Sequence, residues 1–166
     1  MGKKQRTAIS LFSGAGGMDI GFAAAGFKIL ACVEIDPACC QTLEANVPSY
    51  TKVLEADIRR LSGSDLLKKI GQKVGDVDCL FGGPPCQSFS LAGKRHGLDD
   101  ERGQLVGEFI RLVHEIQPKS FVMENVKGMA TWGNGAVLDY IEHKLANPEG
   151  GISSSVYTVS HQVLNA

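Results

Sequence analysis

The feature that most constrains the fold is a regular alternation of strand-like and helix-like segments along the chain. Short β-branched and apolar runs predict strands at 7–12, 28–34, 52–55, 77–81, 120–125 and 156–165. Helix-forming segments lie between them at 18–27, 37–47, 64–70, 103–116 and 136–146. Strands that alternate with helices in this way predict an α/β fold, with a mostly parallel sheet covered by helices on both faces.

Two helix starts carry local signals. Pro37 stands at the expected first position of the helix over 37–47, where its missing N–H costs nothing. Ser64 is the expected N-cap of the helix over 64–70. In the last segment, Tyr157, Val159, His161 and Val163 alternate with other residues, which predicts a half-buried strand.

Composition narrows the class of protein. A chain of 166 residues is long enough for one domain with a sizeable core, so 1–166 is predicted to be a single domain. The net charge of −1 gives no global signature of nucleic-acid binding, but a local patch or a partner could supply positive charge. No stretch is long and apolar enough to cross a membrane, and the N-terminal run after "MGKKQR" is too short for a signal peptide.

The cysteine pattern excludes two further classes. The chain has 5 cysteines and no CxxC pair, which fits neither a disulfide framework nor a zinc site. We therefore expect no metal site and a reducing, cytoplasmic location. Cys32 and Cys79 lie inside strand runs and are predicted to be core residues, while Cys39 and Cys40 lie in a helix.

A glycine-rich loop, "FSGAGG" at 12–17, joins the first strand to the first helix. At this junction a ligand can approach the backbone and the helix N-terminus, although the loop alone is equally typical of a tight structural turn. Glu34 ends the second strand about 20 residues later, where such folds place an acid that bonds ribose hydroxyls. Asp57 follows the third strand and could reach an adenine amino group. Together these features predict a nucleoside-bearing cofactor.

The loop itself suggests which cofactor. No GK[ST] follows it, and its glycines depart from G-x-G-x-x-G, so neither a P-loop nor the usual dinucleotide loop is present. Asp19, at the start of the first helix, would repel a pyrophosphate and suit a cationic ligand. S-adenosylmethionine carries a sulfonium and an ammonium group, and this charge favours it over NAD.

A stiff corner, "GGPPCQSFS" at 82–90, follows the strand over 77–81. Its glycine and proline pairs hold Cys86 in one place, so the corner is either a tight structural turn or a device that presents the thiol. Glu124 in "ENV" ends the next strand, and it either faces the same crevice or forms an ordinary strand-end salt bridge.

A thiol and a carboxyl group beside a methyl donor suggest methylation of a pyrimidine at carbon 5. The Cys86 thiolate would add to carbon 6, which makes carbon 5 nucleophilic, and a protonated Glu124 would stabilise the adduct at ring N3. This chemistry needs a lowered pKa for Cys86 and a raised pKa for Glu124.

The motifs resemble those of the DNA (cytosine-5)-methyltransferases. "FSGAGG", "GGPPCQSFS" and "ENV" look like motifs I, IV and VI of that family, and "DDERGQL" at 99–105 looks like motif V. The resemblance covers nearly the whole chain and implies a Rossmann-like, S-adenosylmethionine-dependent methyltransferase fold. It implies that Cys86 is the nucleophile, that Glu124 acts at cytosine N3 and that Asn125 helps to order the site. It further implies an S-adenosylmethionine pocket lined by Phe12, Gly14, Gly16, Glu34, Ile35, Asp57, Ile58 and Pro84.

The resemblance also implies the partners. In this family the target cytosine of double-stranded DNA is flipped out of the duplex, because carbon 6 cannot be reached in the stack. Loop 86–103, with Lys94, Arg95, His96 and Arg102, would close over the DNA or form a solvated surface. The family continues with a QxRxR motif, a target-recognition domain and a last helix beside the cofactor loop, and none of these is present in the 166 residues. We therefore expect a fold that is incomplete at the C-terminus and a complementary C-terminal segment or subunit, without which activity is poor.

Three alternatives stay open at this point. One is a tRNA cytosine-5 methyltransferase with the same motifs. Another is a non-catalytic, cofactor-binding subunit of a split methyltransferase, against which the intact Cys86 and Glu124 argue. A dehydrogenase is more distant, since Asp19 and the Pro-Pro-Cys corner disfavour it.

Overall fold

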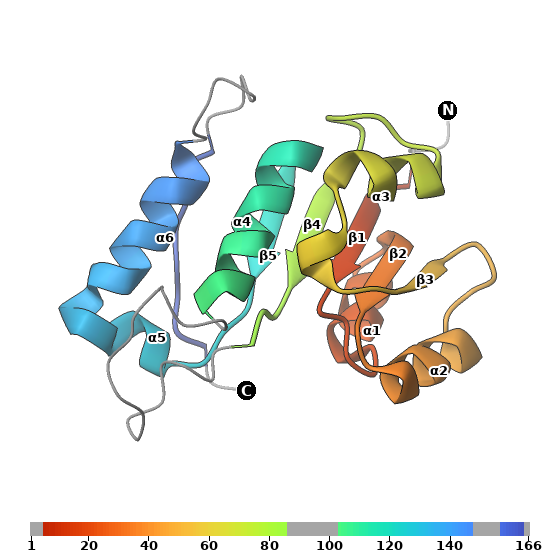
Figure 1. Ribbon diagram of the computed structural model, residues 1–166, viewed down its shortest axis with the longest axis horizontal. Coiled ribbons are helices and arrows are strands. Elements are labelled where there is room, and N and C mark those ends of the chain that lie inside the picture. Colours follow the sequence, from red (N-terminus) through yellow and green to blue (C-terminus); the bar gives the residue numbers. More distant parts are fainter. Residues whose placement is uncertain (1–4, 86–102, 148–156, 165–166) are drawn as a thin grey trace.

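The computed structural model describes residues 5–85, 103–147 and 157–164 (Figure 1). Its strands are β1 (Thr7–Leu11), β2 (Lys28–Glu34), β3 (Lys52–Glu55), β4 (Cys79–Gly82) and β5 (Ser120–Met123). Its helices are α1 (Gly17–Ala24), α2 (Pro37–Asn46), α3 (Gly63–Ile70), α4 (Gly103–Ile116), α5 (Gly128–Thr131) and α6 (Ala136–Ala146). Short 3₁₀ turns lie at η1 (Ile58–Arg60) and η4 (Trp132–Gly135).

The strands form one parallel sheet in the order β3-β2-β1-β4-β5. From β1, the next two strands are added on one side of the sheet, and the chain then crosses back so that β4 and β5 lie on the other side of β1. Crevices at the carboxyl end of open α/β sheets form where the strand order reverses in this way, which here is between β1 and β4. The predicted parallel α/β architecture is therefore confirmed, and the crevice position follows from it.

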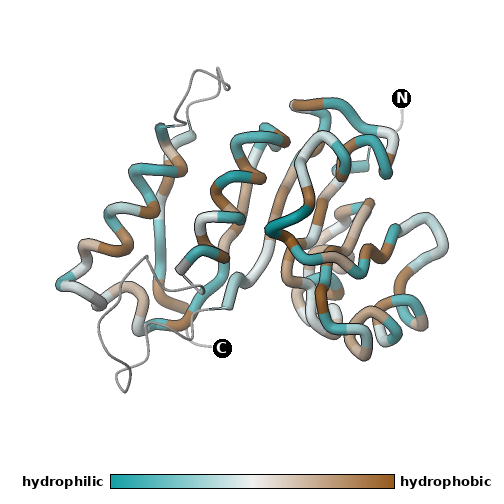
Figure 2. Tube along the Cα trace, viewed as in Figure 1, coloured by the Kyte–Doolittle hydropathy of each residue, from teal (hydrophilic) through white to brown (hydrophobic). Residues whose placement is uncertain are grey.

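Side chains that alternate along the strands pack into two separate hydrophobic clusters, one on each face of the sheet. Ile9 and Leu11 face a cluster built with α3, α4 and α6, whereas Ala8 faces a cluster that includes Leu43 of α2. This alternation follows from the two-residue period of a strand. Figure 2 shows apolar and polar residues alternating along α4 and α6, as expected for helices with one buried face. Helices thus cover both faces of the sheet, as the sequence predicts.

Two local predictions are wrong. The N-cap of α3 is Ser62 rather than Ser64, because the Ser62 hydroxyl accepts the Asp65 N–H at 3.1 Å and the helix begins at Gly63. The expected strand over 156–165 is absent from its described part, 157–164. There the Tyr157 hydroxyl donates to the Pro118 carbonyl at 2.6 Å and the ring packs edge-on against Phe121, so side chains hold this segment in place of a backbone ladder.

None of the helices in the described ranges is long and apolar enough to cross a membrane.

Gly82 provides a test of how closely the central strands pack. A β-carbon at this position would collide with the Leu11 carbonyl oxygen on β1. We expect Gly82→Ala to lower the free energy of unfolding by about 1–3 kcal/mol, because the main chain of β1 has no room to move. Urea denaturation of the full chain measures this change.

Gly107 is the matched control, since it is exposed on α4 and a β-carbon there meets nothing within 4 Å. Gly107→Ala is expected to raise the free energy of unfolding by about 0.5–1 kcal/mol through helix propensity. Equal stability of the two variants would mean that β4 can move away from β1.

Candidate functional site

The carboxyl ends of the parallel strands bring most of the predicted site residues to one edge of the sheet (Figure 1). The glycine loop follows β1, Glu34 ends β2 and Asp57 follows β3. Pro84 follows β4, and Glu124 and Asn125 follow β5. Because β1 and β4 are neighbours, the glycine loop and the Pro-Pro corner lie next to each other at the centre of this edge. Cys86 and the basic residues of loop 86–102 lie outside the described residues.

The glycine loop is a tight turn with left-handed backbone. Phe12, Gly14 and Gly16 have φ values of 54°, 54° and 92°. The Ser13 N–H donates to the Val33 carbonyl at 3.2 Å, and the Ser13 carbonyl accepts the Gly16 N–H at 3.0 Å. A left-handed conformation at a bulky residue such as Phe12 costs about 1–3 kcal/mol and persists only where the surroundings impose it. Strain of this kind is typical of functional loops.

Glu34 ties this loop to the end of β2. One carboxylate oxygen accepts the Gly14 N–H at 2.7 Å. The other accepts the N–H groups of Ile35 and Asp36 at 2.8 and 3.0 Å. A carboxylate has about four lone-pair positions, so these bonds leave capacity for a further donor at the edge of the sheet. Ile35, with 58% of its surface exposed, adds an apolar side chain beside this carboxylate.

Asp57 is engaged by its own neighbour. Both of its carboxylate oxygens accept bonds from the Arg59 guanidinium, at distances of 2.8–3.1 Å. These hydrogen bonds hold the pKa of Asp57 below its usual range. Ile58 is only 5% exposed and packs into the core, so a contact from Ile58 to a ligand would come from its main chain.

The structure overturns the role expected of Asp19. Its side chain is 5% exposed and is turned toward the sheet, where it accepts bonds from the Ser10 hydroxyl at 3.1 Å and the Cys32 thiol at 3.2 Å. Burial raises the pKa of Asp19 and, together with the neighbouring carboxylate, that of Cys32. A carboxyl group enclosed in this way does not face a ligand, so the argument from Asp19 to a cationic cofactor is wrong.

On the other side of the crevice, hydrogen bonds join the end of β5 to the Pro-Pro corner. The Glu124 N–H donates to the Gly82 carbonyl at 3.0 Å, and the Asn125 side-chain amide donates to the Pro84 carbonyl at 3.0 Å. The Glu124 carboxylate lies so close to Gly83 that a β-carbon there would be 3.0 Å from Oε2. The main chain of Glu124 is therefore fixed beside the corner that leads to Cys86, and its exposed carboxyl group lies next to Gly83.

Sequence reasoning missed Arg111, which supports the β3 side of the site. From α4 it donates to the carbonyls of Ile58 and Leu61 at 3.0 and 2.9 Å, and it also pairs with Glu108 and Glu115. Arg111 thus holds the turn that follows Asp57. The spacing of the two acids at i−3 and i+4 was the available signal, but it also describes an ordinary helix surface.

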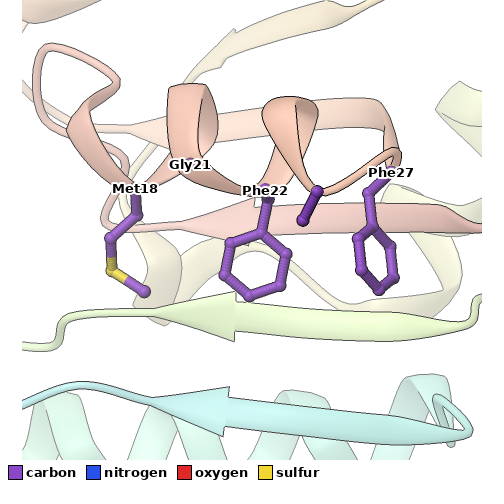
Figure 3. Close-up of a pocket in the computed structure, with 5 residues that line it drawn as sticks. Met18, Gly21, Phe22 and Phe27 are labelled. Carbon is purple, nitrogen blue, oxygen red and sulfur yellow. The ribbon is translucent and has the colours of Figure 1, made fainter.

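A second missed feature is an apolar cavity of about 340 Å³, lined by Met18, Gly21, Phe22, Ala25 and Phe27 (Figure 3). The Phe22 ring stacks on Phe81 of β4, with ring centroids 3.8 Å apart. Val122 of β5 pairs in register with Phe81, and 45% of its surface is exposed. We refer to the cavity and the exposed Val122 on the neighbouring strand together as the apolar strip. The cavity has no polar lining residue, so it is suited to docking and not to chemistry.

Three potential ligands for a metal ion do not come together anywhere in the described parts of the chain.

Comparison with known proteins identifies the family. The chain matches the family described as C-5 cytosine-specific DNA methylase over residues 6–166. The chain belongs to this family. It is 52% identical over 163 residues to the Type II methyltransferase M.AquIA of Picosynechococcus, and the match covers 98% of this chain and 65% of that relative. It is 50% identical over 131 residues to M1.HphI of Haemophilus parahaemolyticus, covering 78% of this chain and 34% of the relative.

Solved structures agree with the assignment of this C-5 cytosine methylase chain. An E. coli prophage protein assigned as a DNA modification methyltransferase superimposes with a TM-score of 0.71 at 34% identity, covering 84% of this chain and 37% of the other. DNMT2 of Spodoptera frugiperda gives a TM-score of 0.61 at 26% identity, covering 85% and 41%. The fold is thus the Rossmann-like fold of the C-5 cytosine methylases. The chain spans about two thirds or less of the length of each of these four proteins.

The burial of Asp19 predicts a pH dependence of stability. Because its folded-state pKa is raised above the ordinary 3.8, its contribution to stability is fully present below the unfolded-state pKa. That contribution is lost as the pH rises through the raised folded-state pKa. We therefore expect the stability of Asp19→Asn, relative to the unmodified chain, to increase with pH from 3.8 toward neutrality.

Urea denaturation at a series of pH values measures this difference. Asp139→Asn is the control, because it removes the same charge from an exposed position on α6. Parallel pH profiles for Asp19→Asn and Asp139→Asn would contradict the prediction.

Proposed function

We propose that the protein transfers a methyl group from S-adenosylmethionine to carbon 5 of cytosine in double-stranded DNA, through a covalent adduct with Cys86. The observation that carries the proposal is the pair of hydrogen bonds that fixes Glu124 and Asn125 against the corner before Cys86, in a chain of the C-5 cytosine methylase family. Its relatives are named Type II methyltransferases, so we further propose a role as the modification enzyme of a restriction-modification system.

The residues at the carboxyl edge of β1, β2 and β3 fit S-adenosylmethionine, which when bound supplies an electrophilic methyl group. Gly14 and Gly16 leave the loop open to close approach by a ligand. Glu34 has capacity for a ribose hydroxyl, and the exposed Ile35 offers an apolar surface for a flat ring. We propose that Phe12, Asp57, Ile58 and Pro84 also line the pocket. Asp57 would bind the cofactor while its carboxylate stays bonded to Arg59. Ile58 would contribute its main chain, because its side chain is buried.

On the other side of the crevice, the chain's own groups would perform the covalent chemistry. The Cys86 sulfur forms a bond to carbon 6 of a flipped cytosine, and Glu124 holds a proton at N3 that balances the charge of the adduct. The electron pair displaced from the 5,6 double bond then makes carbon 5 the nucleophile for methylation. A base removes the proton from carbon 5, the bond from sulfur to carbon 6 breaks, and the thiolate is restored. Asn125 acts as a positioning residue because it bonds the Pro84 carbonyl.

We also propose that a complementary C-terminal segment or subunit is needed for robust activity. What supports this is the apolar strip, which consists of the cavity at Met18, Phe22 and Phe27 (Figure 3) and the exposed Val122 on β5. An apolar strip of this kind is typical of a surface that another element covers. The apolar face of a helix from the complementary part would bury it.

Covalent trapping tests the chemistry. Duplex DNA with 5-fluorocytosine at the target position blocks loss of the substituent at carbon 5, so the adduct accumulates when S-adenosylmethionine is present. With the complementary part added, we expect a denaturant-stable protein–DNA adduct. Cys86→Ser should abolish it, and Glu124→Gln should slow its formation by about 10²–10⁴-fold, the usual contribution of a general acid.

Cys39→Ser is the matched control, because this half-buried thiol lies on α2, away from the Pro-Pro corner. It should leave adduct formation unchanged. An adduct that survives Cys86→Ser would overturn the assignment of the nucleophile. An adduct formed equally fast without the complementary part would overturn the proposed dependence on it, and an adduct with tRNA but not with duplex DNA would overturn the substrate.

A further inference from the structure

A continuous chain of hydrogen bonds runs beneath the glycine loop. The Ser13 hydroxyl is 2.8 Å from the Ser10 hydroxyl, and the Ser10 hydroxyl is 3.1 Å from one oxygen of the Asp19 carboxyl group. The other oxygen of Asp19 accepts the Cys32 thiol at 3.2 Å. All four side chains are at least nine-tenths buried, with exposed fractions of 9% or less. This buried hydrogen-bond network connects the glycine loop, β1, α1 and β2, which are the four elements that meet at the candidate cofactor site.

The hydrogen bonds converge on Asp19 from both sides. Each hydroxyl carries one proton, and so does the thiol. Ser13 can donate to Ser10, which leaves the Ser10 proton for Asp19, while Cys32 donates to Asp19 from the opposite side. Asp19 is therefore the common acceptor, and its two oxygens are engaged by two different strands. A side chain without two acceptor oxygens cannot satisfy both donors.

The same bonds span the strained residue of the loop. Ser10 and Ser13 flank Phe12, whose φ of 54° is rarely adopted by a bulky residue. The bond between the two hydroxyls links the chain two residues before Phe12 to the residue after it, and the Ser13 N–H donates in addition to the Val33 carbonyl of β2. On the outer side of the loop, Gly14 is held by Glu34. The glycine loop is thus held on its buried side by the hydrogen-bond network and on its outer side by the Glu34 carboxylate.

We propose that Ser10, Asp19 and Cys32 are positioning residues that hold the glycine loop in its ligand-competent conformation. The nature of the ligand rests on the proposed function, whereas the restraint on the loop does not. A ligand that binds only the ordered loop has an apparent dissociation constant inversely proportional to the fraction of molecules in that state. Weakening the buried hydrogen-bond network would lower the fraction of molecules with an ordered loop and so weaken binding, although none of the three residues would touch the ligand.

Two substitutions at Cys32 separate hydrogen bonding from packing. Cys32→Ala removes the donor to Asp19, whereas Cys32→Ser keeps a donor of similar size at the same position. Cys79→Ala is the matched control, since Cys79 is 2% exposed, belongs to the same apolar cluster and comes from β4. Cys79→Ala therefore removes a similar amount of buried packing as Cys32→Ala, but it leaves the hydrogen-bond network intact.

The experiment measures two quantities on the complete enzyme. The first is amide hydrogen exchange at Gly14 and Gly16, which reports loop order without any ligand. The second is the dissociation constant for S-adenosylmethionine by calorimetry. We expect Cys32→Ala to accelerate exchange about fivefold, the effect of one net hydrogen bond on the opening of the loop, and to raise the dissociation constant by at most that factor. Cys32→Ser should restore both quantities, and Cys79→Ala should change neither while lowering the melting temperature.

Ser10→Ala should have a larger effect than Cys32→Ala, because it interrupts the chain between Ser13 and Asp19. Equal exchange rates and affinities for Cys32→Ala and Cys79→Ala would overturn the inference and leave the network with a packing role alone. If the unmodified enzyme fails to bind S-adenosylmethionine, the proposed cofactor is wrong, and the exchange rates still decide whether these residues order the loop.

Discussion

The close parallel packing of β1 between β2 and β4 is the constraint on which the rest of the structure depends. Its tightest point is the pair Leu11 and Gly82, where the missing side chain of glycine lets the two strand ends lie against each other. This contact lies where the strand order reverses, so the loops that follow β1 and β4 leave the sheet next to each other. The glycine loop and the Pro-Pro corner are neighbours for this reason, although about 70 residues separate them in sequence.

The two sides of the crevice are built by different means. On the side of β1 and β2, charged and polar groups fix the backbone, with Glu34 above the glycine loop and the Ser10–Asp19–Cys32 chain below it. On the side of β4 and β5, two prolines remove backbone freedom and the Asn125 amide holds the Pro84 carbonyl. Both arrangements reduce the conformational entropy that a ligand would otherwise have to remove on binding. A preorganised site of this kind suits the proposed reaction, which must align a thiol, a carboxyl group and a methyl donor.

The apolar strip near Phe22 and Val122 is the surface on which the proposed complementary part would pack. Phe22 stacks on Phe81, so the strip rests on the same strand, β4, that leads to the Pro-Pro corner. An element that covers this strip would therefore pack near the strand that leads toward the proposed nucleophile in the sequence. In the proposed function, binding of the complementary part and order at the Pro-Pro corner are therefore coupled through β4.

The order of elements, the parallel sheet and the strand-end positions of Glu34, Asp57, Glu124 and Asn125 could be predicted from the sequence, because hydrophobic period and turn residues are local properties. The resemblance in motifs likewise identified the family. Three features could not be predicted in this way. Asp19 faces the sheet rather than a ligand, Asp57 is held by Arg59, and the segment at 157–164 is held by Tyr157 without forming a strand. For Asp19 and Tyr157 the outcome depends on which groups from other segments meet in space. The Asp57–Arg59 pair is local, but it forms in a turn that Arg111 of α4 holds. Only the tertiary structure decides where such a side chain finds its hydrogen-bond partner.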